Sequence, residues 1–371
     1  MKRRQFLSAA GTGAVTGAVA TAAAFPAPAI AQTMPEIKWR CASSFPKSLD
    51  TIYGGGEIVA KRVAELTDNK FQIRVFAGGE IVPGLQVLDA VQNNTVECGH
   101  TAAYYYVGKD PTFALDCSVP FGLNARQQNA WLMYGGGMEL MREFYAGYNI
   151  VNFPAGNSGA QMGGWFRKEI KTPADLQGLK MRIAGLAGQV MAKLGVVPQQ
   201  IAGGDIYPAL EKGTIDAAEW VGPYDDEKLG FYKVAQHYYY PGWWEPGPSF
   251  SFYVNKAAWD ALPPTYKAAI ETASADANQR MVAKYDAQNP AALKRLVGAG
   301  AKLHAYPREI LQAAHQATFQ LYDELSASNA NWKKVYTPWK AYRDEEYTWF
   351  RVSENYLENF SYSAAAQAKK G

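Results

Sequence analysis

Between residues 37 and 102, apolar and polar positions alternate with two different periods. A period of two marks short strands, and a period of about 3.6 marks helices. The helix expected over 49–67 carries Ile52, Val59 and Val63 on one face, and a second is expected over 84–94. Strands are expected around these helices over 37–43, 71–76 and 96–102. Strands and helices in this order predict a doubly wound α/β lobe.

The stretch 172–220 continues the alternation with two further β-α units. Their strands and helices are expected over 179–183, 185–195, 196–198, 207–213 and 215–220, with Gly195 and Gly213 closing the helices. Consecutive β-α units place the ends of their strands side by side, where small ligands bind in open α/β sheets. We therefore expect a binding site at the ends of these strands.

Two segments are expected to cross between lobes. The turn Gly156-Asn157-Ser158-Gly159 is the first, and Gln161 is expected to begin the second lobe's first strand. The second crossing should precede a strand over 249–255 that rejoins the first lobe. The expected organisation is a first lobe from 32–155, a second lobe from 156–245, a return to the first lobe with long helices from 246–330, and an aromatic C-terminal helix from 331–371.

The last part of the chain is predicted to be helical. One long helix should start at Pro263-Pro264 and break at Pro290. The segment 332–360 carries more aromatic surface than a solvated tail should expose, so it must pack on the chain's own lobes or on a partner subunit.

Residues 1–31 are typical of a cleaved export signal, with the pair Arg3-Arg4 of twin-arginine type. The whole chain has 37 Lys+Arg and 34 Asp+Glu. Because this segment holds three cations and no acid, the remaining chain has a net charge of zero, which does not favour a nucleic-acid partner. Export places the protein in the periplasm.

Cysteines and histidines give no sign of a metal site. Cys41, Cys98 and Cys117 are widely spaced, so at most one disulfide can form, and buried free thiols are the expected state. The four histidines have no ligand spacing and are interpreted as structural.

Arg182 is the first candidate for binding chemistry, since it stands among apolar residues in an expected strand. A buried guanidinium needs an anion, and its planar fork suits a carboxylate ligand. The alternative is an arginine whose stem packs while its head reaches solvent or a structural carboxylate.

Aromatic residues mark two further candidates. Tyr104 and Tyr105 follow the strand over 96–102 and either enter a cleft or stack between the lobes. Trp244 and Glu245 lie in the segment 241–248, which is either an aromatic plug at a hinge or part of a small-molecule cleft.

Common enzyme motifs are absent, including GxSxG, HExxH, the Walker sequence and a GxGxxG after a strand. The carboxylates Asp225, Asp226 and Glu227 are interpreted as the N-terminus of a helix. An exported enzyme and a sensor module remain as rival classes, without a motif that supports either.

The segments 175–182 and 209–219 closely resemble the periplasmic solute-binding subunits of TRAP (tripartite ATP-independent) transporters, bacterial solute-binding protein family 7. The resemblance extends over nearly all of the chain after the signal. It implies a two-lobed periplasmic-binding-protein-like α/β fold that closes over a small carboxylate. It also implies a membrane permease as partner, and no enzymatic activity.

Within this family, Gln161, Glu219-Trp220 and the Gly-Trp-Trp-Glu segment 242–245 are similar to the metal-dependent branch that binds 2-oxoacids and lactate. The resemblance assigns Arg182 to the ligand carboxylate. It assigns the cation to Gln161, Glu219 and the Trp220 carbonyl. The remaining cleft residues implied are Asn157, Tyr104, Tyr105, Trp244 and Glu245.

One carboxylate among neutral oxygens favours a cation of low charge, so sodium is expected ahead of calcium. The alternative ligand class is a C4-dicarboxylate or another organic acid bound without metal. Members of this branch exchange a C-terminal helix between dimer mates, which implies a homodimer.

Overall fold

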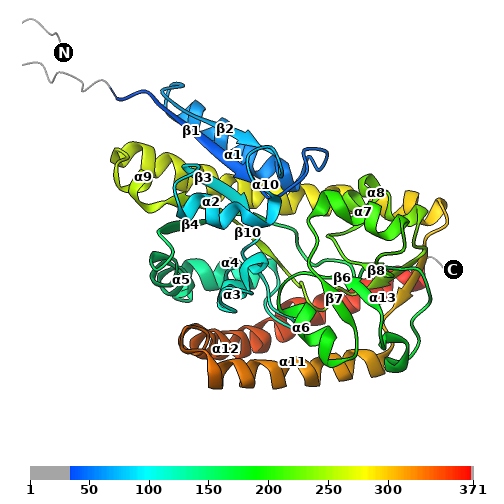
Figure 1. Ribbon diagram of the computed structural model, residues 1–371. Coiled ribbons are helices and arrows are strands. Elements are labelled where there is room, and N and C mark those ends of the chain that lie inside the picture. The colour runs from blue at the N-terminus through cyan, green and yellow to red at the C-terminus, as the bar shows by residue number, and fades with distance from the viewer. Residues whose placement is uncertain (1–33, 369–371) are drawn as a thin grey trace, which may run out of the picture. The chain divides into compact units, whose positions relative to one another are not determined.

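The computed structural model describes residues 34–368, and the expected signal over 1–31 lies outside them. The first lobe is built on a five-stranded sheet of order β2-β1-β3-β10-β4, in which β10 runs antiparallel to both neighbours (Figure 1). Its strands are β1 (Ile37–Ser43), β2 (Phe71–Phe76), β3 (Cys98–Thr101), β4 (Ile150–Asn157) and β10 (Ser249–Asn255). Its helices are α1 (Ile52–Leu66), α2 (Val87–Gln92), α3 (Phe113–Cys117), α4 (Ala125–Tyr134), α5 (Gly137–Ala146) and α9 (Lys256–Asp260), with 3-10 turns η1 (Gly84–Gln86) and η2 (Ala103–Tyr106).

The second lobe is built on a six-stranded sheet of order β11-β9-β5-β8-β6-β7. Its strands are β5 (Trp165–Phe166), β6 (Lys180–Arg182), β7 (Val197–Gln199), β8 (Ala217–Ala218), β9 (His237–Tyr240) and β11 (Lys302–Ala305). Its helices are α6 (Gly185–Lys193), α7 (Gly203–Glu211) and α8 (Pro223–Leu229), with 3-10 turns η3 (Pro173–Leu176) and η4 (Phe231–Lys233). Two sheets with helices confirm the two-lobed α/β fold.

The parallel pairing of β6 with β8 brings the two expected β-α units together. Arg182 is the register partner of Ala218, so the ends of both strands meet. Glu219 follows β8 directly and therefore lies beside Arg182. This confirms that the ends of these strands lie side by side.

The crossings between the lobes differ in detail from expectation. Strand β4 continues through Asn157, which pairs with Ser249 of β10, so the turn expected over 156–159 is half strand. Gln161 precedes β5 by four residues instead of starting it, because its N–H bonds the Glu245 carbonyl of the other crossing at 3.1 Å. In the range 246–330, β10 returns to the first sheet as expected, but β11 pairs with β9 and joins the second sheet.

The long helix α10 (Pro264–Gly298) packs on both lobes. Gly55 of α1 and Gly156 of β4 face Met281, and a Cβ on either glycine would overlap that side chain, so these glycines let the helix approach closely. Asn289 accepts a hydrogen bond from the Tyr224 N–H of α8 at 3.0 Å. The break expected at Pro290 was wrong, since the helix continues through this residue. Packing along its length compensates for the one missing hydrogen bond.

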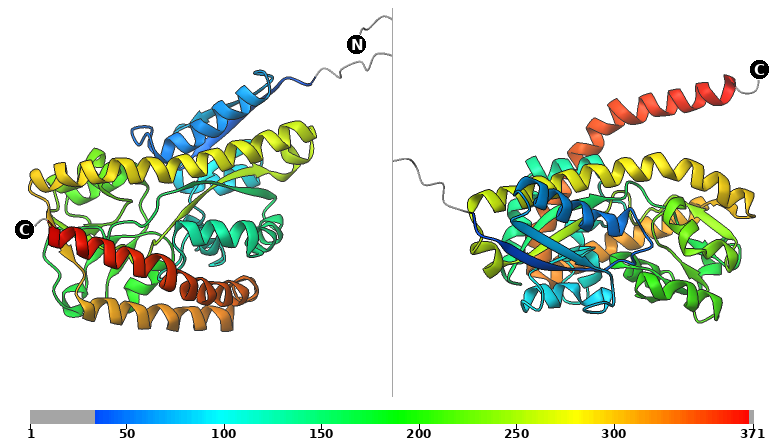
Figure 2. Two further views of the ribbon diagram at one scale, coloured as in Figure 1. Left: turned by 180° about the vertical axis from the view of Figure 1, so that it is seen from behind. Right: turned by 90° about the horizontal axis from the view of Figure 1, so that it is seen from above.

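The C-terminal helices are α11 (Arg308–Ser328), α12 (Ala330–Phe350), the π-helical turn η5 (Arg351–Asn355) and α13 (Tyr356–Ala368). The aromatic residues of this part divide into two groups. Trp332, Tyr336 and Trp339 are buried against the chain's own body. No residue of α13 is buried, and Figure 2 shows this helix leaving the other elements. The end of the chain therefore presents apolar side chains without an intramolecular contact surface.

Within the described part of the chain, Cys41, Cys98 and Cys117 are buried free thiols, as expected. Among residues 34–368, no helix combines the length and apolar character needed to cross a membrane.

Candidate functional site

Arg182 is fully buried, although it carries a positive charge. Its Nη1 donates to the Glu219 carboxylate and, at 2.8 Å, to the Glu219 carbonyl. Its Nε donates to the Ile201 carbonyl at 3.1 Å. Its Nη2 has no partner. The head group is therefore not solvated but is paired with a carboxylate of the chain itself, as the alternative interpretation expected. One nitrogen, Nη2, is left for a ligand carboxylate.

Glu219 is the counterion of Arg182 and is equally buried. Its Oε1 also accepts from the Ala184 N–H at 3.0 Å, whereas its Oε2 has no partner. Burial raises the pKa of the Glu219 carboxyl, and the charge of Arg182 opposes this rise. One oxygen thus holds Arg182 and the start of α6 in place, and the other is free to bind a cation.

Gln161 and Glu245 bring the two crossings to the same place. The Gln161 amide nitrogen donates to Ser158 Oγ at 3.1 Å, which orients its Oε1 away, and that oxygen has no partner. Glu245 Oε2 is also buried without a partner. Burial, followed by the charge of Glu219, raises the pKa of Glu245 well above its usual range, against the opposing effects of Arg182 and the Tyr104 hydroxyl.

Trp220 covers the guanidinium from one side, with its ring centre 5.0 Å from Arg182 Cζ. Trp220 follows Glu219 directly, so its carbonyl is held next to that carboxylate by the chain itself. Its indole nitrogen is buried without a hydrogen-bond partner.

Tyr104 and Tyr105 reach the site from the first lobe, in the η2 turn after β3. Gly185, at the start of α6, has a φ of +65°, and a Cβ at this position would lie 3.1 Å from Tyr104 Cβ. The Tyr105 carbonyl accepts from Gln200 of the second lobe at 2.8 Å. Both tyrosines are buried, so the two lobes are closed over Arg182.

Asn157 and Trp244 are also buried, and they differ in their hydrogen bonding. The Asn157 amide donates to the Gly247 carbonyl at 3.0 Å and accepts from the Gly159 N–H at 2.8 Å, so both of its ends hold the crossings. Its contact with a ligand stays a prediction. Trp244 packs on Trp243 with 4.8 Å between ring centroids, and its indole nitrogen has no partner.

Besides the indole nitrogens of Trp220 and Trp244, four buried polar atoms in this cluster have no partner, namely Arg182 Nη2, Glu219 Oε2, Gln161 Oε1 and Glu245 Oε2. Buried polar groups in native proteins are nearly always paired, so this concentration indicates a polar ligand. Oxygen donors with one or two carboxylates also fit a hard cation such as sodium or calcium. Among residues 34–368, no group of three His, Cys, Asp or Glu side chains is placed to hold a metal ion.

Sequence reasoning missed several contributors. The Ala184 N–H and the Ile201 carbonyl hold the ion pair through the backbone, which no side-chain pattern reveals. Asp225 and Asp226 do begin α8, but they are buried and bond Tyr285, Trp165 and Tyr238. Burial raises the pKa of Asp225 to about 7. No sequence pattern indicated that these aromatic side chains would contact Asp225 and Asp226.

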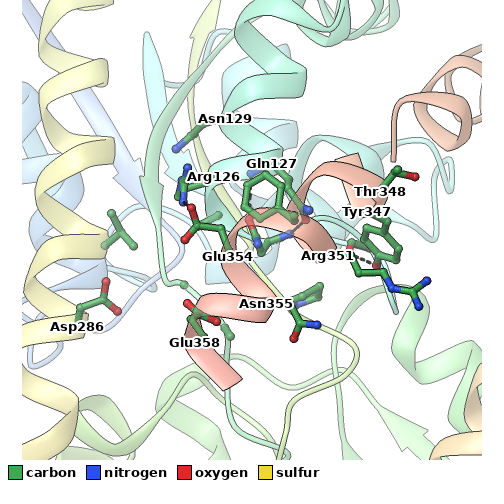
Figure 3. Close-up of a pocket in the computed structure, with 18 of the residues that line it drawn as sticks. Arg126, Gln127, Asn129, Asp286, Tyr347, Thr348, Arg351, Glu354, Asn355 and Glu358 are labelled. Atoms are coloured by element: carbon green, nitrogen blue, oxygen red, sulfur yellow. Dashed lines mark hydrogen bonds and ion pairs between the residues drawn. The ribbon is translucent and has the colours of Figure 1, made fainter. Parts of the chain in front are cut away.

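A cavity of about 1190 Å³ lies behind the crossings, next to the C-terminal helices (Figure 3). Gly159, Ala160 and Pro246 form part of its wall, so it adjoins the residues that carry Gln161 and Glu245. Arg126 and Glu354 form an ion pair of 2.7 Å in this wall.

Residues 42–329 match the model of a protein family described as bacterial extracellular solute-binding protein, family 7. A monocarboxylate 2-oxoacid-binding periplasmic protein from Nostoc sp. (strain PCC 7120) is 54% identical, over 98% of this chain and 100% of the relative.

Two crystal structures of TRAP transporter solute-binding proteins are similar throughout. The protein from Bordetella bronchiseptica RB50 is 56% identical with a TM-score of 0.89, covering 90% of this chain and 99% of that chain. It is a mixed-occupancy dimer with co-purified calcium and picolinate in the bound active site. The protein from Pseudoalteromonas atlantica T6c, with bound sodium and pyruvate, is 39% identical with a TM-score of 0.84, covering 87% and 99%. This chain thus belongs to family 7 of the bacterial extracellular solute-binding proteins, the solute receptors of TRAP transporters, and is not an enzyme.

Proposed function

We propose that this protein binds a small 2-oxo or 2-hydroxy monocarboxylate, such as pyruvate or lactate, together with a metal cation, and delivers it to a TRAP membrane permease. The observation that carries the proposal is the group of four unpaired buried atoms around the Arg182–Glu219 ion pair. A monocarboxylate with an adjacent oxygen, accompanied by a cation, would supply partners of both signs for them.

Each residue has a role that follows from its contacts. Arg182 Nη2 would donate to the ligand carboxylate, since Nη1 and Nε are already bonded. Glu219 Oε2, Gln161 Oε1 and the Trp220 carbonyl would hold the cation. When bound, the cation supplies positive charge to the ligand's carboxylate and to its 2-oxo or 2-hydroxy oxygen. Tyr104, Tyr105 and Trp244 would exclude water from the closed site.

Charge supports the cation. The cluster contains the guanidinium of Arg182 and the carboxylate of Glu219, whereas the raised pKa of Glu245 favours its neutral form. An anionic ligand would therefore add a negative charge that no residue of the cluster balances. Buried charges must be compensated, so a cation favours ligand binding. Sodium is proposed ahead of calcium because only Glu219 among the three cation ligands carries a charge. The relatives support both ions, with calcium in the Bordetella protein and sodium in the Pseudoalteromonas protein.

Calorimetric titration tests this proposal. Purified protein is unfolded, freed of ligand and cations with a chelator, and refolded. It is then titrated with pyruvate, longer 2-oxoacids, lactate and succinate, each with sodium, with calcium and with neither. We expect 2-oxo and 2-hydroxy monocarboxylates to bind with a dissociation constant that rises when the cation is withheld. Binding of succinate alone, without any cation, would contradict the ligand class and the metal.

The proposal includes a homodimer formed through the C-terminal helix. Leu357 and Phe360 of α13 are 63% and 69% exposed, which is unusual for apolar side chains on one helix. The cavity behind the crossings offers a surface for the same helix of a second copy (Figure 3). The Bordetella relative is a dimer, which supports dimer formation.

The proposal also includes export by the twin-arginine route, through Arg3 and Arg4.

Replacing Leu357 and Phe360 by Glu is expected to convert the dimer to a monomer, because the charges cannot be buried in an interface. Sedimentation velocity across the micromolar range measures the change. Exchanging the exposed Met133 and Tyr134 of α4 for Glu serves as the control. A wild-type protein that sediments as a monomer throughout this range would contradict the dimer.

A further inference from the structure

Asp50 joins the two lobes through residues other than those around Arg182. It lies in the turn before α1, in the first lobe, and half of its side chain is exposed. Lys228 donates to its Oδ1, and the Tyr224 hydroxyl donates to its Oδ2 at 3.2 Å. Both donors belong to α8 of the second lobe. These contacts are therefore made only while the lobes are together.

A third donor comes from the helix that packs on both lobes. Lys284 of α10 donates to Asp50 Oδ2 at 2.6 Å and to its carbonyl at 3.0 Å. Lys284 is three residues beyond Met281, which packs on α1 and β4 of the first lobe. Lys284 thus orients the Asp50 carboxylate from its own side and leaves it directed at α8.

The donors on α8 are held ready for this carboxylate. Lys228 Nζ lies 3.5 Å from the centre of the Tyr224 ring, and the Tyr224 N–H is fixed by Asn289 of α10. Partial burial alone would raise the pKa of Asp50, but hydrogen bonds from Lys228 and Lys284 and their charges hold this pKa at about 2. The carboxylate therefore stays ionised at any ordinary periplasmic pH.

We infer that Asp50 is a positioning residue for ligand retention, which holds the lobes closed through Lys228 and Tyr224 and so sets the rate at which the bound acid leaves. This inference rests on the proposed function. The contacts form after the acid has entered, so they act on dissociation and hardly on association. Because these contacts stabilise only the closed arrangement of the lobes, they shift the equilibrium between open and closed states toward the closed one.

The alternative is that Asp50 only stabilises the N-terminus of α1. A negative charge just before a helix N-terminus favours the helix dipole. That role would be lost in Asp50→Asn and kept in Lys228→Met, because Lys228 touches α1 only through Asp50. The two variants therefore separate retention from helix stability.

Stopped-flow or surface-plasmon measurements with pyruvate and the required cation test the inference. We expect Asp50→Asn and Lys228→Met each to speed dissociation by about 3- to 30-fold with little change in association, as for a network of partly exposed charges. The double variant should dissociate no faster than Asp50→Asn alone, because Lys228 acts through Asp50.

Glu227→Gln is the matched control. Glu227 neighbours Lys228 on α8 and pairs with Arg295 of α10 at 2.6 Å, without reaching the first lobe. Dissociation from this variant should match wild type. Wild-type dissociation rates in both Asp50→Asn and Lys228→Met, or an equal acceleration in Glu227→Gln, would overturn the role of Asp50 in retention and leave the proposed function intact. A wild-type protein that binds none of the acids would overturn the proposed function and the inference with it.

Discussion

Replacing Arg182 by Lys is expected to weaken acid binding at least about 100-fold, because one ammonium cannot serve the Glu219 carboxylate and a ligand carboxylate in the way a planar fork does. In the structure, Nη1 and Nε are used by Glu219 and Ile201, and only Nη2 is left for the ligand. Lys retains the charge and keeps Glu219 paired. Calorimetry with pyruvate, after circular dichroism has established the fold, measures the loss.

Arg182→Met should remove binding altogether, and it carries a second cost. It leaves Glu219 buried without its counterion, which destabilises a protein by about 3–5 kcal/mol. Arg343→Lys is the control, since Arg343 is also buried but lies on α12 and pairs with Asp344 at 2.6 Å. If Arg182→Lys bound pyruvate as tightly as wild type, Arg182 would not be the carboxylate anchor.

Replacing Glu219 by Gln is expected to lower the affinity for the cation at least about 100-fold. Even residues that only orient a metal ligand contribute about 10- to 100-fold to metal affinity. Gln keeps an oxygen for Ala184 and Arg182 but loses the negative charge that faces the cation. Acid binding should fall with the cation and recover as sodium or calcium is raised. Titrations of pyruvate at increasing cation concentration measure the recovery.

The partly buried carboxylate of Glu227 provides the comparison for this variant, because Glu227→Gln removes a charge from the same lobe and Glu227 pairs with Arg295 rather than Arg182. If Glu219→Gln bound pyruvate with wild-type affinity in the presence of a chelator, the cation would have no part at this residue. Loss of acid binding that no cation concentration restores would indicate that Glu219 acts only through Arg182.

Local patterns were enough to predict the two lobes. Alternating apolar residues in β1 and β10, and the glycines that close the expected helices over 185–195 and 207–213, are properties of short segments. The sequence also identified Arg182 as a buried cation that needs an anion. It could not identify Glu219 as the partner from residue type alone, because 37 positions separate the two and only the parallel pairing of β6 with β8 joins them.

Tertiary contacts decided what the patterns left open. Asn157 has the residue type of a ligand contact, but its two amide ends bond Gly247 and Gly159. Asp225 was interpreted as part of a helix N-terminus, and its buried carboxylate accepts a hydrogen bond from the hydroxyl of Tyr285, 60 residues later. Pro290 predicted a break, and packing of α10 against both lobes overrides that local preference.

The uninterrupted course of α10 has a mechanical consequence. Proline has no N–H, so the carbonyl of Asp286 lacks its partner within the helix. This turn follows Met281, which packs on the first lobe, and includes Asn289, which accepts from the Tyr224 N–H of the second. If the lobes separate, we expect α10 to bend at this turn, because one backbone hydrogen bond is missing there. Bending at a single turn would give the separation of the lobes one hinge axis.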